Sequence, residues 1–99
     1  MNLIKLSSDL IKFKSVTPNS AGSLEFIEGI LKKNRFNCHL LEFGDKKIKN
    51  LYAVIKGGKG PNLCFAGHTD VVPAGNLKDW STNPFKPTIK NGVLYGRGA

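Results

Sequence analysis

The stretch PNLCFAGHTDVVP, residues 61–73, decides how the rest of the sequence is interpreted. The apolar run at 63–66 has the length and composition that predict a fully buried strand. Directly after Gly67 the run is followed by His68, and two residues later by Asp70. Ligands of open α/β sheets bind just outside the carboxyl ends of strands, so this position predicts a functional site.

His68 and Asp70 are residue types that suit a metal site. Side chains two apart on an extended segment point the same way, which lets these two face one cavity. An imidazole can bind a metal while a neighbouring carboxylate holds the ring in the required tautomer. A His-x-Asp at a strand end is also typical of a hydrogen-bonded loop without catalytic function, and the pair by itself leaves both interpretations open.

The sequence around this pair narrows the choice. SVTP at 15–18 precedes it, and Trp80, NPF at 83–85 and GVLYGRGA at 92–99 follow it in order. This ordered set resembles the N-terminal part of the M20 family of di-metal amidohydrolases and peptidases, and the resemblance covers essentially the whole chain. It implies an α/β fold: the N-terminal portion of a zinc-aminopeptidase-like catalytic domain, with a mixed β-sheet and helices packed on its faces.

The same resemblance implies a domain organisation. Residues 1–99 would be the N-terminal part of the M20 catalytic domain, with its sheet incomplete. In the family, the motif that ends here at Ala99 is followed after one residue by a metal-bridging aspartate. We therefore expect the remaining catalytic residues, and a dimerisation domain, to lie outside these 99 residues.

The activity that the resemblance implies is metal-dependent hydrolysis of an amide bond, with two zinc ions, or cobalt, in each full-length subunit. His68 corresponds to a ligand of one metal. Asp70 corresponds to the active-site aspartate that orients and polarises this histidine. Arg97 lies inside the family motif, where its implied role is to shape the glycine-rich turn.

The expected partners are a small dianionic amide substrate and a second copy of the full-length protein in a homodimer. The resemblance leaves open whether the cleaved bond is a succinyl amide, an acetyl amide or a peptide.

The formal charge of +8 raises an alternative from another class, a basic nucleic-acid-binding module. The lysines, however, are spread along the chain and do not gather in one block with interleaved aromatic residues. The densest cluster, Lys46, Lys47 and Lys49, predicts a solvated turn between strands. We therefore expect no nucleic-acid partner.

Residues 1–14 contain three lysines and no uninterrupted apolar core, so they do not resemble a signal peptide. No apolar run approaches the length of a membrane span. We expect a cytoplasmic protein without membrane association.

Cys38 and Cys64 fall on predicted strands without metal-ligand spacing, which predicts two buried, reduced thiols.

Apolar periodicity predicts helices over residues 2–13 and 23–33. Ser23 is the expected N-cap of the second helix. That helix should end near Asn34, a residue that tolerates the left-handed conformation.

Strands are predicted over 37–43 and 51–55, and the second is apolar on both faces, which predicts an internal strand covered on each side. GGKGP at 57–61 lacks the Ser or Thr and the helix of a phosphate-binding loop, and predicts a tight connection between two strands. An Asn-Gly pair inside 88–95 predicts a hairpin. Trp80 and Phe85 are expected to pack beneath the site or cover its rim.

Overall fold

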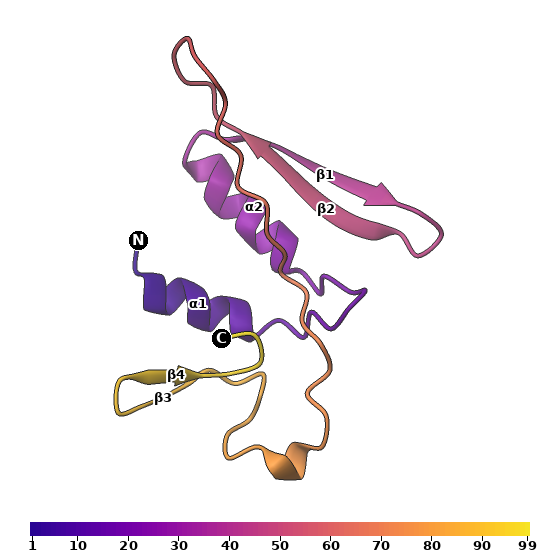
Figure 1. Cartoon of the computed structure of the whole chain (residues 1–99), viewed down its shortest axis with the longest axis vertical. Helices are drawn as coiled ribbons and strands as arrows, with labels where there is room; N and C mark the ends of the chain where they lie inside the picture. The colour runs from indigo at the N-terminus through magenta and orange to yellow at the C-terminus, as the bar shows by residue number, and fades with distance from the viewer.

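The computed structural model describes residues 1–99, which form two helices, two separate antiparallel hairpins and one 3-10 turn (Figure 1). In chain order the elements are α1 (Leu3–Ile11), α2 (Ser23–Lys33), β1 (Asn37–Phe43), β2 (Ile48–Val54), η1 (Leu77–Asp79), β3 (Thr88–Lys90) and β4 (Val93–Tyr95). The predicted α/β class is confirmed. In place of the predicted mixed sheet with helices on its faces, these residues form two separate antiparallel hairpins, with α2 packed on the first of them.

Helix α1 begins at an N-cap residue, Asn2, whose side chain satisfies a backbone N–H that has no partner within the helix. The Asn2 side chain accepts a hydrogen bond from the backbone N–H of Lys5 at 3.1 Å, as an N-cap should. The helix ends at Ile11, two residues before the predicted end, and Ile11 is the hydrophobic side chain buried most deeply in the chain. Its burial fixes which face of α1 points inward.

Helix α2 covers the predicted range, but its N-cap is Gly22 and not Ser23. Gly22 has a φ of 92°, a left-handed conformation that glycine adopts without steric cost. Ser23 is the first helical residue, and its hydroxyl donates to the Ser20 carbonyl at 2.7 Å. The predicted cap was therefore wrong by one residue, because the Ser23 hydroxyl is used outside the helix.

The C-terminus of α2 closes in a Schellman arrangement. The N–H of Phe36 donates to the Leu31 carbonyl and the N–H of Arg35 to the Lys32 carbonyl, each at 3.0 Å. The helix ends at the predicted place, with Asn34 as C-cap. The left-handed residue is Arg35, with a φ of 67°, and not Asn34.

Strands β1 and β2 pair antiparallel from Asn37 opposite Val54 to Phe43 opposite Ile48. Alternate side chains lie against α2, and Lys49 of β2 forms an ion pair with Glu25 of that helix. The opposite face of the hairpin is exposed. The prediction that the second strand is covered on both sides was wrong, because α2 packs on only one face.

Lysines 46 and 47 lie in the exposed turn of this hairpin, as predicted for the basic cluster. Lys49 does not, because it belongs to β2, and its hydrogen bond to Glu25 raises the pKa of the lysine. The same hydrogen bond lowers the pKa of the Glu25 carboxyl. The predicted cluster therefore divides between a solvated turn and a contact that joins β2 to α2.

The apolar run at 63–66 forms no strand, and its side chains are exposed, Leu63 at 82% and Phe65 at 89%. The prediction of a buried strand was wrong, because a strand needs a neighbour to pair its backbone groups and no other strand adjoins residues 63–66. For the same reason the prediction that 57–61 connects two strands was wrong: the segment follows β2, and no strand follows it directly.

The predicted burial of the two thiols was also wrong. Cys64 is exposed and Cys38 is only partly covered, although both cysteines are unpaired.

The second hairpin agrees with its sequence signal. β3 and β4 pair in register from Thr88 opposite Tyr95, and both turn residues, Asn91 and Gly92, have positive φ angles of 50° and 77°. That combination is the type I′ turn that an Asn-Gly pair favours.

Little of the chain is buried. The radius of gyration, 15.7 Å, exceeds the value of about 13 Å expected for a compact domain of this length. Two of the four buried residues are serines: Ser15 lies in the connection between α1 and α2, and Ser23 is the first residue of α2. No helix has the length and apolar character needed to cross a membrane. The centre of the molecule therefore depends on polar contacts.

The left-handed Arg35 gives the first testable prediction. Arg35→Gly should stabilise the chain by up to about 1 kcal/mol, because glycine removes the steric cost of a left-handed residue and loses part of that gain as unfolded-state entropy. Urea unfolding followed by far-UV circular dichroism measures the change. Lys33→Gly, two residues earlier at the last residue of α2, is the matched control and should destabilise by up to about 1 kcal/mol. Destabilisation by both substitutions would show that Arg35 is not strained.

Candidate metal-binding site

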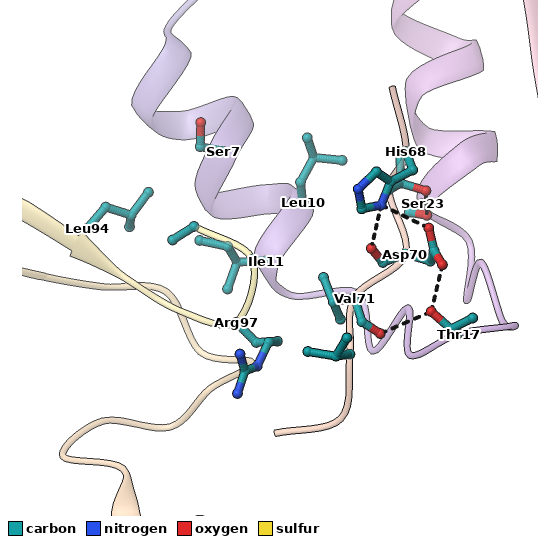
Figure 2. A pocket seen from close by; sticks show the side chains of 14 residues that line it. Ser7, Leu10, Ile11, Thr17, Ser23, His68, Asp70, Val71, Leu94 and Arg97 are labelled. Carbon is teal, nitrogen blue, oxygen red and sulfur yellow. Dashed lines mark hydrogen bonds and ion pairs between the residues drawn. The ribbon is translucent and has the colours of Figure 1, made fainter. Parts of the chain in front are cut away.

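The site is an open hollow of about 690 Å³ between α1, the segment after Gly67 and the C-terminal turn at 96–99 (Figure 2). Leu10 and Ile11 line it from α1, and Leu94 lines it from β4. His68 and Asp70 lie at its edge. The two predicted site residues are thus brought together, beside a cavity and on the surface of the molecule.

The His68 ring is turned toward Asp70 (Figure 2). Its Nδ1 lies 3.0 Å from Asp70 Oδ1 and 2.9 Å from the main-chain oxygen of the same residue. The His68 side chain is 81% exposed, so the ring is not buried in the interior. The alternation of side chains on an extended segment predicted this pairing.

Thr17 makes the second contact of the Asp70 carboxylate. Its hydroxyl donates to Asp70 Oδ2 at 2.6 Å, with a longer contact of 3.4 Å to the Val71 carbonyl. The hydrogen bond from Thr17, with a further contribution from His68, holds the pKa of the Asp70 carboxyl below its usual value and outweighs the opposing effect of partial burial. Asp70 is therefore ionised at neutral pH and can only accept hydrogen bonds.

This assignment fixes the His68 tautomer. Both atoms that face Nδ1, a carboxylate oxygen and a carbonyl oxygen, are acceptors, so Nδ1 must carry the proton. In the neutral ring the lone pair then belongs to Nε2. A histidine with Nδ1–H bonded to a carboxylate and Nε2 free has the arrangement of a metal ligand.

The segment that carries His68 is held by the connection between the two helices. Val16 and Val71 form a parallel bridge, in which the N–H of Val71 donates to the Ser15 carbonyl at 2.9 Å and the N–H of Thr17 to the Val71 carbonyl at 3.1 Å. The Ser15 hydroxyl donates to the Thr69 carbonyl at 2.8 Å. The Ser23 hydroxyl is hydrogen-bonded to the Thr69 hydroxyl at 3.0 Å.

Sequence interpretation gave SVTP at 15–18 no role in the site. A short polar segment that contains proline is typical of any connection between helices, so nothing local marks Thr17 as a partner of Asp70. The two residues are separated by 53 positions along the chain. The only sequence signal was the place of SVTP in the ordered set of motifs.

Arg97 contacts the loop behind the hollow. Its backbone N–H donates to the Pro84 carbonyl at 2.7 Å, and its guanidinium lies 4.9 Å from the centre of the Trp80 ring. Arg97 and Trp80 both donate to the Ala74 carbonyl, at 3.3 and 2.9 Å. These contacts agree with a structural role for Arg97 and for Trp80.

Residues 1–99 supply only some of the ligands that a zinc site needs. No three His, Cys, Asp or Glu side chains of residues 1–99 are grouped as a metal site. His68 fits one ligand position through Nε2, and Asp70 fits the carboxylate that orients it. Since zinc in proteins takes three or four protein ligands, these residues supply part of a site and do not complete one.

Comparison with known proteins shows which proteins the chain resembles. The profile of peptidase family M20/M25/M40 matches residues 64–99, which include His68, Asp70 and the C-terminal turn. Over 97% of its length the chain is 60% identical to a succinyl-diaminopimelate desuccinylase of Wolbachia pipientis subsp. Culex pipiens. It is 50% identical over 96% of its length to the protein of that name from Ehrlichia canis, and 52% identical over 91% to the one from Rickettsia prowazekii.

The chain resembles the M20/M25/M40 peptidase family, whose profile matches its residues 64–99. It spans about a quarter of the length of these relatives, 24 to 25% of each. The resemblance inferred from the ordered motifs is confirmed.

The turn at the end of the M20 match is closely packed on both sides. A Cβ atom on Gly96 would lie 2.5 Å from Cγ2 of Ile11, and one on Gly98 would lie 2.7 Å from Cγ1 of Val71. Gly98 also has a φ of 81°, which favours glycine. Glycine at both positions lets the turn lie against α1 and against the segment that carries His68, which closes one side of the hollow.

Gly96→Ala should therefore destabilise the chain by about 1–3 kcal/mol, because the buried Ile11 must move to admit the new methyl group. Urea unfolding measures the loss. Gly29→Ala is the matched control: apart from the backbone of α2 itself, no atom lies within 4 Å of a Cβ added there, so the substitution should be neutral or stabilising. Adding Ile11→Ala should remove the clash, so the double variant should lose less stability than the two single losses together. Strict additivity would contradict the proposed contact.

Proposed function

We propose that residues 1–99 are the N-terminal part of the catalytic domain of a metal-dependent succinyl-diaminopimelate desuccinylase. The observation that carries the proposal is the free Nε2 of His68, at an open hollow, with Nδ1 bonded to an ionised carboxylate. The identity of 50 to 60% to relatives of that name, over nearly the whole chain, supports the choice of reaction.

The reaction proposed is hydrolysis of N-succinyl-LL-2,6-diaminopimelate to succinate and LL-2,6-diaminopimelate, a step of lysine and diaminopimelate biosynthesis. Water supplies the hydroxyl group to the succinyl carbonyl carbon, the amide C–N bond breaks, and the amine nitrogen takes the remaining proton.

His68 is proposed to bind one of two zinc or cobalt ions through Nε2, and Asp70 to keep the imidazole in the tautomer that leaves Nε2 free. When bound, such ions lower the pKa of a coordinated water toward about 7 and polarise the amide carbonyl. The further ligands and a glutamate that serves as general base are proposed to come from outside residues 1–99. Residues 1–99 would thus contribute one correctly oriented imidazole ligand to the proposed reaction.

The proposed partners are a dianionic small-molecule substrate and, in the full-length enzyme, a second subunit. The net charge of +8 supports an anionic substrate, since a positive field raises the encounter rate with anions. We propose no nucleic-acid or membrane partner, and a cytoplasmic location. Another M20 activity, on an acetylated amino acid or a peptide, is the competing outcome of the test below.

A chimera tests the function. The 96 aligned residues of the Wolbachia pipientis relative are replaced by those of this chain, and hydrolysis of N-succinyl-LL-2,6-diaminopimelate is compared with that of N-acetylornithine and a dipeptide. We expect the succinyl substrate to be preferred. His68→Ala should lower kcat/KM by more than about 100-fold, because a ligand contributes at least as much as its orienting partner.

His39→Ala is the matched control, since His39 lies on the exposed face of β1 and should leave kcat/KM unchanged. Preference for the acetyl or dipeptide substrate would favour another M20 activity. A chimera with the melting temperature of its parent but no hydrolysis of any of the three would contradict the proposal.

The incomplete donor set gives a separate prediction. The 99-residue chain alone should bind zinc weakly, because one imidazole cannot replace the several ligands that a stable site requires. Isothermal titration calorimetry should show no saturation at micromolar zinc, and His68→Ala should change the titration little. Tight stoichiometric binding that His68→Ala abolishes would show that residues 1–99 hold a complete site.

A further inference from the structure

We propose that Thr17 is the positioning residue of this site: its hydroxyl fixes the rotation of the Asp70 carboxylate, which in turn holds His68 with Nε2 free. The inference rests on the proposed role of His68 as a metal ligand. The Thr17 hydroxyl contacts Asp70 and the Val71 carbonyl and has no hydrogen bond to the imidazole, so its effect on His68 passes through Asp70.

The three side chains form a continuous chain of hydrogen bonds (Figure 2). Thr17 Oγ1 lies 2.6 Å from Asp70 Oδ2, and Asp70 Oδ1 lies 3.0 Å from His68 Nδ1. Each carboxylate oxygen therefore has its own partner, and one rotation of the carboxylate satisfies both.

Asp70 needs an external constraint because little else fixes it. Its side chain is 41% exposed, and the terminal torsion of an aspartate is broad and has no strong preference of its own. The His68 side chain is more exposed still, so packing contributes little to its orientation. Hydrogen bonds remain as the main restraint on both groups.

Thr17 can supply that restraint because its own position is fixed relative to Asp70. Its backbone N–H donates to the carbonyl of Val71, the residue next to Asp70, and Val71 donates back to Ser15. A β-branched side chain also has few accessible rotamers. The hydroxyl is thus held by the same pair of backbone segments that it joins.

The experiment measures the His68 tautomer in the metal-free 99-residue chain. Histidine labelled with ¹⁵N gives only two sets of ring signals, from His39 and His68, and His39 serves as an internal reference. At a pH where the ring is neutral, the ¹⁵N shifts of His68 should show the Nδ1–H form in excess. This differs from free histidine, which favours Nε2–H.

Thr17→Val keeps the shape and branching of the side chain and removes the hydroxyl. It should lower the ratio of Nδ1–H to Nε2–H at His68 about threefold to tenfold, the worth of one hydrogen bond. Thr17→Ser should retain most of the ratio. Thr88→Val is the matched control. The Thr88 hydroxyl donates to the Lys86 carbonyl away from the site, so its removal should leave the tautomer ratio of His68 unchanged.

A ratio that stays the same or rises in Thr17→Val would overturn the inference, as would a wild-type chain without the Nδ1–H excess. If Thr17→Ser keeps the Nδ1–H excess, the loss in Thr17→Val is due to the missing hydroxyl. Unchanged His39 signals in both variants show that the fold is intact. The proposed function fails on different data: an inactive chimera with a normal Thr17 effect would remove the hydrolase assignment and leave the positioning role of Thr17 in place.

Discussion

The site depends on one tertiary contact, the parallel bridge between Val16 and Val71. Its two backbone hydrogen bonds join the connection between α1 and α2 to the segment that carries His68. Without them, a stretch that forms no helix or strand of its own would have no defined position over the hollow. The side-chain contacts of Thr17 with Asp70, and of the two buried serines with Thr69, add to this bridge and require it to be in place.

Polar contacts carry this part of the structure because the apolar core is small. Ile11 is the one hydrophobic side chain that is fully buried apart from Pro84, whereas Ser15 and Ser23 are exposed by only 2% and 1%. A buried hydroxyl without a partner costs free energy, so each serine must find its acceptor and has few positions in which it can do so. Directional bonds of this kind specify geometry more sharply than apolar contacts, which suits a segment that must place an imidazole.

Local pattern predicted what local physics determines. The range of β1, the extent of α2 and the type I′ turn at Asn91 follow from periodicity and turn chemistry within a few residues. The pairing of His68 with Asp70 was also predictable, because it needs only the alternation of an extended segment. The exposure of 63–66 was not predictable, since an apolar run becomes a buried strand only beside a neighbouring strand, and none adjoins this run. Thr17 escaped prediction because 53 residues separate it from Asp70 and no local signal marks the contact.

The choice of aspartate at position 70 has a physical reason that goes beyond its charge. An ionised carboxylate offers only acceptors, so the nitrogen that faces it must carry the proton and the other nitrogen must be free. An asparagine could satisfy Thr17 and His68 in either of two orientations, with its oxygen or its amide group toward Nδ1, and the second would leave the proton on Nε2. Two acceptors on one planar group, one held by Thr17 and one by His68, exclude that alternative. The selectivity of the site for one tautomer thus arises from the absence of any donor at Asp70, whose main-chain oxygen also faces Nδ1, and the hydroxyl of Thr17 holds the carboxylate in place.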